Sequence, residues 1–199
     1  MNRSFAREVL KLRPTWQLAA GYFYQLPVDH RLCGFVYERI PYSGAYLWHY
    51  AFPLYVPSDF IHLGFGDRLP HPQGFMPRDP HRQALAEAAE FICRIAPYEA
   101  DTYSWGSLPG FLTLLESKRG SEYLPRTVAH ALTLILLGRY GEAETPLNDV
   151  ARHADRDQIP PGFVESMEEI RADLARDGEQ AVECLKRWEA DSKTRFGIR

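Results

Sequence analysis

The sequence predicts an α+β protein in which a small antiparallel sheet packs on a bundle of helices. Three observations carry this prediction. Apolar residues alternate with period two between Gly34 and Asp67, which is typical of strands. From His81 onward, apolar residues recur with the period of a helix. Between these regions, residues 68–80 contain four prolines and one glycine, which indicates a connecting loop.

We therefore expect three parts. Residues 1–67 form an N-terminal helix and the sheet, residues 68–80 form a Pro-rich connector, and residues 81–199 form the helical part. A chain of 199 residues with 45% hydrophobic residues is long enough to bury a core without disulfides or metals. Because the predicted helix at Leu124–Leu137 is apolar on nearly every side, we expect the sheet and the helices to share one core.

The first part begins with a short helix over residues 4–12, which Pro14 ends because proline lacks a backbone donor. Residues 16–26 are ambiguous, and their second half favours a strand because Tyr and Phe are typical of strands. The next strand is expected over Cys33–Ile40.

An aromatic strand follows and organises the sheet. Its large side chains fall on every second position: Tyr46, Trp48, Tyr50, Phe52, Leu54 and Val56. Ala45, His49 and Ala51 fall on the other face. We expect the large set to pack against the helices. Ser58 and Asp59 then turn the chain into a last strand at Phe60–Gly66, which gives an antiparallel meander of three or four strands.

The helical part is expected to hold five or six helices, each with an apolar stripe and a Gly or Pro near its end. They are placed over residues 81–95, Leu108–Lys118, Leu124–Leu137, Gly141–Ala154, Phe163–Arg176 and Glu179–Asp191.

The passage ALTLILLGRYGEAETPLNDV resembles a tetratricopeptide-type helical hairpin, with Gly138 ending one helix and Ala143 near the start of the next. A second, weaker match to this pattern follows, in which Ala181 corresponds to Ala143. The spacing of 38 residues is longer than the usual repeat of about 34. The resemblance implies repeat-like packing. Any antiparallel helix pair also places small residues at its crossing, so both interpretations stay open.

A second resemblance covers residues 30–195. The segment FPLYVPSDFIHLGFGDRL, the LPGFL helix, the LLGRYGEAE hairpin and the closing acidic helices resemble a family of uncharacterised bacterial cytoplasmic proteins. They are also similar to immunity proteins of contact-dependent toxin systems. The shared motifs, Pro-Leu-Tyr-Val-Pro and Phe-Gly-Asp, are structural. The resemblance therefore implies a fold and a protein partner, and it assigns no catalytic residue.

Charge and cysteine content narrow the functional classes. The formal net charge of −3 gives no electrostatic reason to bind nucleic acid or an anionic membrane. The three cysteines are far apart and form no CxxC pair, which predicts reduced thiols in a cytoplasmic protein. No stretch has the length and apolarity of a signal peptide or a membrane span, and we expect no cofactor.

Histidines are the first place to look for chemistry. His71 and His81, with Asp67 and Asp79 nearby, have a spacing that fits no standard zinc pattern, so we expect no metal. His49 and His62 lie in predicted strands and would share one open face with Tyr55 and Arg39. Such a cluster suits a general base, but no Ser or Cys nucleophile is evidently placed beside it. Polar residues on the solvent face of a sheet are the competing interpretation.

The favoured function is a non-enzymatic protein-binding module, namely an immunity protein that occludes a toxin. Thirteen of the 26 aromatic residues lie between Tyr22 and Phe65, and Tyr, Trp and Arg are enriched at interfaces. The candidate partner-binding residues are Arg39, Tyr42, Tyr46 and His49 on the sheet, and Glu165, Glu168 and Asp173 on the helices.

Two alternatives remain. In the first, a peptide-binding adaptor uses a groove of helices 124–191, with contacts around Arg139, Tyr140 and Glu144. In the second, a hydrolase or transferase uses His49 or His62 as its base.

Overall fold

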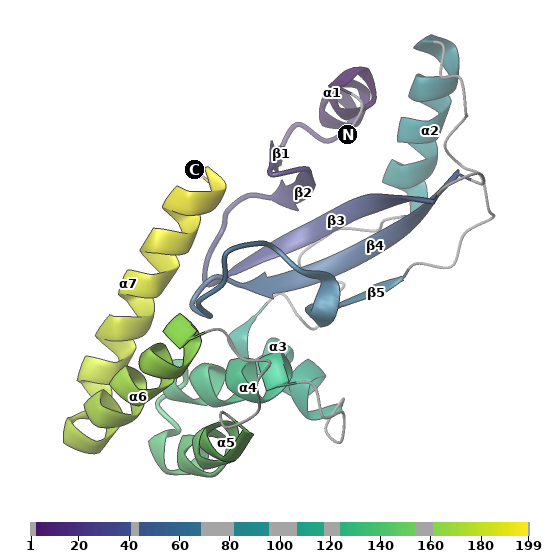
Figure 1. The fold of residues 1–199 in the computed structure, drawn as a ribbon. Coiled ribbons are helices and arrows are strands. Elements are labelled where there is room, and N and C mark those ends of the chain that lie inside the picture. Colours follow the sequence, from purple (N-terminus) through teal and green to yellow (C-terminus); the bar gives the residue numbers. More distant parts are fainter. Residues whose placement is uncertain are drawn as a thin grey trace. The chain divides into compact units, whose positions relative to one another are not determined.

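The computed structural model describes residues 3–40, 44–68, 82–95, 107–117, 124–153 and 161–198. These residues form five strands and seven helices, which confirms the α+β class (Figure 1). The chain forms two compact units. The sheet unit comprises Met1–Phe52 and Ile61–Tyr103, and the helical unit comprises Pro53–Phe60 and Ser104–Ile198. Residues 69–80 of the expected connector lie outside the described residues, and the expected shared core stays a prediction.

The sheet has one strand more than the upper estimate from the sequence. Its strands are β1 (Trp16–Ala19), β2 (Tyr22–Gln25), β3 (Arg31–Ile40), β4 (Gly44–Pro53) and β5 (Gly66–Arg68), and they lie in the order β1-β2-β3-β4-β5. The additional strand is β1, which pairs with β2 through a two-residue turn at Ala20 and Gly21. Both turn residues have positive φ angles, of 50° and 92°, as a tight hairpin between twisted strands requires.

The expected strand at Phe60–Gly66 is wrong. Phe60 is 66% exposed, and Leu63–Phe65 forms a single 3₁₀ turn before β5 begins at Gly66. The His62 Nδ1 atom accepts a hydrogen bond from the Gly64 backbone N–H, which favours a turn over an extended chain. The two glycines beside Phe65 further lower the preference for a strand.

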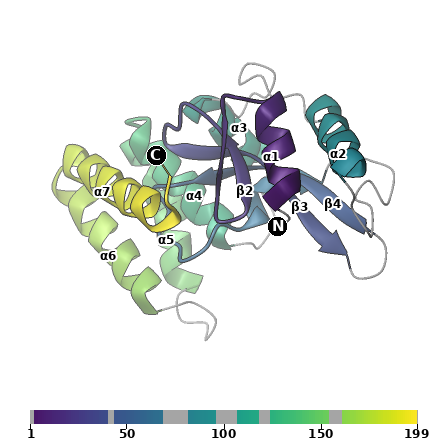
Figure 2. The ribbon, with the colours of Figure 1, turned by 90° about the horizontal axis from the view of Figure 1, so that it is seen from above.

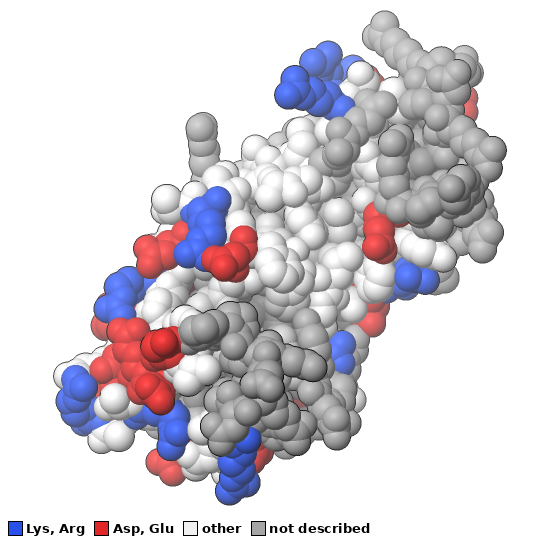
Figure 3. Space-filling model, in the orientation of Figure 1, with Lys and Arg blue, Asp and Glu red and all other residues white. Residues whose placement is uncertain are grey.

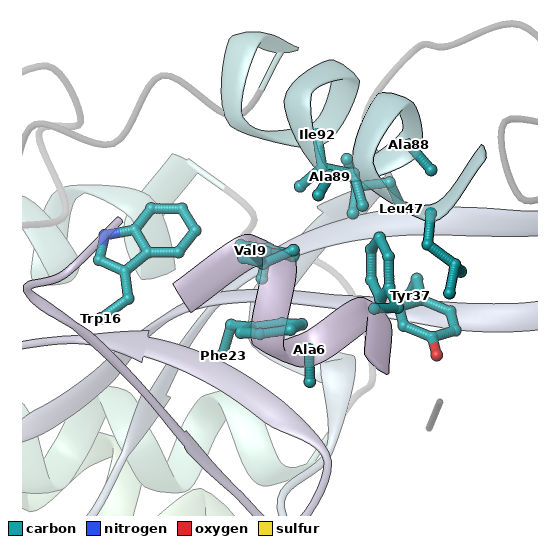
Figure 4. Close-up of a cluster of buried hydrophobic side chains, with 12 residues drawn as sticks. Ala6, Val9, Trp16, Phe23, Tyr37, Leu47, Ala88, Ala89 and Ile92 are labelled. Atoms are coloured by element: carbon teal, nitrogen blue, oxygen red, sulfur yellow. The ribbon is translucent and has the colours of Figure 1, made fainter. Parts of the chain in front are cut away.

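Two helices cover one face of the sheet. These are α1 (Arg3–Leu12) and α2 (Arg82–Ile95), which lie side by side over β3 and β4 (Figure 2). Side chains from both helices meet the strands in one buried cluster (Figure 4). The cluster contains Phe5, Ala6, Val9, Trp16, Phe23, Phe35, Tyr37, Leu47, Leu85, Ala88, Ala89 and Ile92. Thus α2, which was expected to belong to the helical part, packs on the sheet.

The face of β4 that these helices cover carries the smaller side chains. Leu47 belongs to the buried cluster, and His49 and Ala51, which share its face, are also buried. Tyr46 and Trp48 on the other face are only half-buried. Four members of the larger set are buried as the alternation predicts, namely Tyr50, Phe52, Leu54 and Val56. The smaller set allows close approach of the Ala88 and Ala89 side of α2.

The helical unit is built around one apolar helix. Its helices are α3 (Leu108–Ser117), α4 (Leu124–Leu136), α5 (Tyr140–His153), α6 (Pro161–Arg176) and α7 (Gly178–Phe196). Every residue of α4 from Val128 to Ile135 is buried, and α4 contacts α3, α5 and α7. This confirms that α4 is central. None of the described helices is both long and apolar enough to cross a bilayer.

The pairs α4–α5 and α6–α7 form helical hairpins, as the sequence predicts. Gly138 ends α4 with a φ angle of 72°, and the N–H groups of Gly138 and Arg139 donate to the carbonyls of Ile135 and Leu134. This pair of bonds is a Schellman end, which favours glycine. Ala143 and Ala181, the two small residues matched by the repeat pattern, are both fully buried.

The second hairpin packs on the first where Gly178 lies directly against the Tyr140 side chain. A methyl group on Gly178 would lie 2.3 Å from the Tyr140 ring. We therefore expect Gly178→Ala to lower the free energy of unfolding by about 1–3 kcal/mol. Gly162 also lies at the start of a helix but has open space around it, so Gly162→Ala is the matched control and should be neutral or stabilising by up to about 1 kcal/mol. Equal stability of the two variants in urea unfolding would contradict this packing.

The segment Pro53–Phe60 leaves β4 and packs in the helical unit. The Tyr55 hydroxyl lies 2.7 Å from the Thr133 hydroxyl of α4, and both residues are fully buried. Arg195 of α7 donates to the Ser58 carbonyl and to the Asp59 carboxylate. Tyr55 is therefore a core residue of the helical unit, and the expectation that it stands on an open face with His49 is wrong.

Candidate functional site

The half-exposed end of β4 carries a group of aromatic and charged side chains. Trp48 pairs directly with Arg68 of β5, Tyr46 lies two residues along the same face, and Glu38 comes from β3. We call these four residues the aromatic–arginine patch. Because side chains alternate along a strand, the patch lies on the face of β4 opposite to Leu47, which packs with α1 and α2.

The side chains of the patch hold one another in place. The Arg68 guanidinium carbon lies 3.5 Å from the centre of the Tyr46 ring and 5.0 Å from the centre of the Trp48 ring. The Trp48 indole N–H donates to the Glu38 carboxylate at 3.0 Å. Cation–π contacts of this kind contribute about 0.5–1 kcal/mol at exposed sites. The patch therefore presents two rings and a guanidinium that support one another.

The other residues predicted for the sheet surface have different positions. Tyr42 and the side chain of Arg39 lie outside the described residues. Tyr46 belongs to the patch, as described above. His49 lies on the opposite face and is only 7% exposed, so its predicted position on an open surface is wrong.

His49 lies near the carboxylate of Asp67. Its Nε2 atom is 3.9 Å from the Asp67 carboxylate, and His49 and Asp67 are direct cross-strand partners. Asp67 is half-exposed, whereas His49 is buried between Leu47 and Ala51, which are buried as well. The pair therefore positions an imidazole inside the sheet unit rather than on a surface that a substrate reaches.

His62 lies in a turn and not in a strand. Its ring contacts Phe52 and Phe65, with centres 5.2 Å and 5.0 Å away, and its Nδ1 atom accepts from Gly64. Burial lowers the pKa of His62 below its ordinary value. His62 is therefore a neutral residue that caps the 3₁₀ turn at neutral pH, and one of its two nitrogens is already engaged.

This lowered pKa predicts a pH dependence of stability. Well above pH 6.5 the imidazole is neutral in both the folded and the unfolded chain, so it does not make the free energy of unfolding depend on pH. Below that value the unfolded chain binds the proton first, so acidification favours unfolding until the folded pKa is passed. His62→Asn keeps an acceptor for the Gly64 N–H but does not titrate. We expect wild type to lose more stability than H62N between about pH 7 and about pH 5. Parallel curves of unfolding free energy against pH would contradict the assignment.

A second group of polar side chains lies between α6 and α7. Glu169, Asp173 and Cys184 each offer one potential ligand atom, and these atoms lie within 4.8 Å of one another. Arg187 donates to the Glu169 carboxylate at 2.5 Å and to the Cys184 sulfur at 3.2 Å. Burial raises the pKa of the Cys184 thiol to about 11. The carboxylates of Glu169 and Asp173 also raise this pKa, whereas Arg187 lowers it. The group is therefore an ion-pair network around a neutral thiol, which is neither a ready metal ligand nor a nucleophile.

The three carboxylates predicted for the helical surface differ in their surroundings. Glu165 and Glu168 are exposed on α6, and neither forms an ion pair within the described residues. Asp173 is half-buried, and its carboxylate lies 3.5 Å from Arg176. Over α6 and α7, acidic and basic side chains lie intermixed (Figure 3). Glu165 and Glu168 thus remain open to a basic partner, whereas Asp173 is engaged inside the unit.

The residues named for a peptide adaptor differ in their surroundings. Tyr140 packs against Gly178, and Arg139 donates to Glu142 through two nitrogens. Glu144 is exposed. For the metal alternative, His71, His81 and Asp79 lie outside the described residues.

Sequence reasoning did not select Arg68 or Glu38. Both residues became candidates only through strand pairing, because the register of β4 and β5 places Arg68 opposite Trp48. The short β5 was expected a few residues earlier, so this register was not available from the pattern.

Comparison of the chain with family models, with curated proteins and with solved structures found no match.

Proposed function

We propose that this chain is a non-enzymatic protein-binding module of the bacterial cytoplasm, and that it acts as an immunity protein which occludes a toxin. The observation that carries the proposal is the aromatic–arginine patch. Trp, Tyr and Arg dominate the binding energy of protein interfaces. In this chain the three residue types meet on one partly exposed surface and are held there by each other and by Glu38.

Preorganisation makes such a patch effective. Ordering a long side chain on binding costs about 0.5–1.5 kcal/mol, and a side chain that is already held avoids much of this cost. Neutralising a toxin requires affinity on the order of nanomolar, or about −12 kcal/mol. An interface of roughly 1,600 Å² reaches this value when a few anchors are well packed. The patch supplies anchors of this kind.

The helical surface supports the same function in a different way. Glu165 and Glu168 are exposed carboxylates without an ion pair in the described part of the chain. Complementary charge at the rim of an interface mainly increases the rate of association. A toxin that acts on a polyanion, such as a nuclease, carries a basic surface that these carboxylates would attract.

Co-expression tests the proposal. The proposal predicts that a large secreted protein with a toxic C-terminal domain is encoded immediately upstream. The chain is expressed with that domain, and cell survival and complex formation are measured. We expect protection by the wild type, loss of protection by the double variant Tyr46→Ala/Trp48→Ala, and a smaller effect of Glu165→Gln/Glu168→Gln. Equal killing with and without the wild-type chain, and no recovered complex, would remove the immunity function.

A further inference from the structure

The aromatic–arginine patch also indicates which chemical group a partner brings to it. We propose that Arg68 is the central binding residue and that it takes a carboxylate of an Asp or Glu side chain on the partner protein. This inference rests on the proposed protein-binding function and deepens it by naming the surface and the partner group.

The geometry of Arg68 leaves its donors available. The Arg68 guanidinium carbon lies 3.5 Å from the centre of the Tyr46 ring, so this contact is made to a ring and not to a hydrogen-bond acceptor. Within the described residues, the exposed side chain of Arg68 takes part in no ion pair and no hydrogen bond. A guanidinium carries five N–H donors in a rigid planar fork that matches a carboxylate with two parallel bonds. The two rings therefore hold a guanidinium whose N–H donors can bind a carboxylate and that no carboxylate of the described residues binds.

Neighbouring charges select the kind of anion. Glu38 lies beside Trp48 in the same patch. A polyanion such as RNA would bring several phosphates against this carboxylate and meet one cation only, and its affinity depends on neutralising many phosphates. A single carboxylate surrounded by apolar contacts fits the patch better, because the aromatic rings shield the pair from water.

Two other arginines of the sheet unit do not share this arrangement. Arg13 donates to the Cys93 carbonyl at 2.6 Å, so part of its guanidinium is already used internally. Arg94 of α2 is exposed and lies 5.7 Å from the centre of a single ring, Phe91. Arg94 therefore offers a matched control, since it is also an exposed arginine beside an aromatic side chain but lacks the second ring.

Selection from a displayed library of random 12-residue peptides tests the proposal with the full-length chain. We expect the selected peptides to share an Asp or Glu at a fixed position, and we expect Arg68→Gln to weaken their binding at least about tenfold. Arg68→Lys keeps the charge but loses the planar fork, so it should also weaken binding. Arg94→Gln should bind as the wild type does. Changing the peptide carboxylate to its amide should weaken wild-type binding by a similar factor and leave R68Q unchanged.

Several outcomes would overturn the proposal. These are selected peptides without a conserved carboxylate, undiminished binding by R68Q, no binder at all, or Arg68-dependent binding of a fluorescent 12-nucleotide RNA. Thermal unfolding of R68Q and R68K checks that both variants are folded. The proposed immunity function fails separately. If co-expression gives no protection while peptides bind through Arg68, the binding role of Arg68 is supported and the toxin partner is rejected. A protective complex that R68Q does not weaken would remove the role of Arg68 alone.

Discussion

Replacing Gly34 with alanine should destabilise the sheet unit by about 3 kcal/mol or more, the largest effect we expect from one methyl group. A Cβ atom at this position would lie 1.9 Å from the Phe23 carbonyl oxygen and 2.8 Å from the Tyr24 Cα. Gly34 pairs with Tyr24 across β2 and β3, so the obstructing atoms are backbone atoms of a paired strand. They cannot move aside by a change of rotamer, and the pairing of β2 with β3 must open.

The loss would spread into the core, because Phe23 and Phe35 stack on each other at 4.6 Å beside Gly34. Urea unfolding and amide hydrogen exchange of β2 and β3 measure the effect. Gly141→Ala is the control, since Gly141 has open space around it and its variant should keep wild-type stability. A G34A variant with unchanged stability and protected β2 amides would show that the close approach of the two strands is wrong.

Thr133→Val should destabilise the helical unit by about 2–3 kcal/mol although valine has nearly the same shape. The Thr133 hydroxyl donates to the Ala129 carbonyl at 2.5 Å and therefore accepts from the Tyr55 hydroxyl at 2.7 Å. Valine removes the acceptor that Thr133 offers to Tyr55, at a position shielded from water. Losing a partner at a buried polar group costs more than the hydrogen bond itself contributes.

A double-mutant cycle separates this hydrogen bond from simple packing. Tyr55→Phe alone should cost about 1 kcal/mol, and the double variant Y55F/T133V should be more stable than the sum of the single effects predicts. Thr133→Ser keeps the hydroxyl and should retain most of the stability. If the two single effects add without coupling, the segment Pro53–Phe60 is not anchored through this bond.

The helices were the part of the fold that the sequence predicted best. The apolar stripe of each helix is long. Gly138 and Pro161 lie at helix boundaries, where the backbone preference of each residue ends or begins a helix. The burial of α4 on all sides followed from its composition alone. Such features depend on residues close in sequence, so they are readable without knowledge of the tertiary structure.

The sheet was harder to predict because its errors arise from tertiary contacts. The β1–β2 turn uses Ala20 at a positive φ angle, which alanine rarely adopts, so the usual Asn-Gly pattern was absent. Both faces of β4 are buried near Tyr50 and Ala51, so alternation of size did not reveal which face meets the helices.

The candidate site was predicted only in part. Tyr46 was predicted because it is an aromatic residue in a predicted strand, and it belongs to the patch. Arg68 was missed because its role depends on lying opposite Trp48, which requires the register of β4 with β5. His49 was placed on an open surface because alternation assigns a face but does not tell which face is covered.

Photo-crosslinking in the co-expressed pair shows directly which surface meets the partner, with p-benzoylphenylalanine placed at either Tyr46 or Glu165. The two positions report on the two candidate surfaces, namely the aromatic–arginine patch and the acidic surface of α6. If the patch is the anchor of a protein interface, the crosslinker at position 46 should capture the toxin domain in high yield, and the one at position 165 should capture little. Capture from position 165 alone, or from neither position in a complex that still forms, would contradict the account.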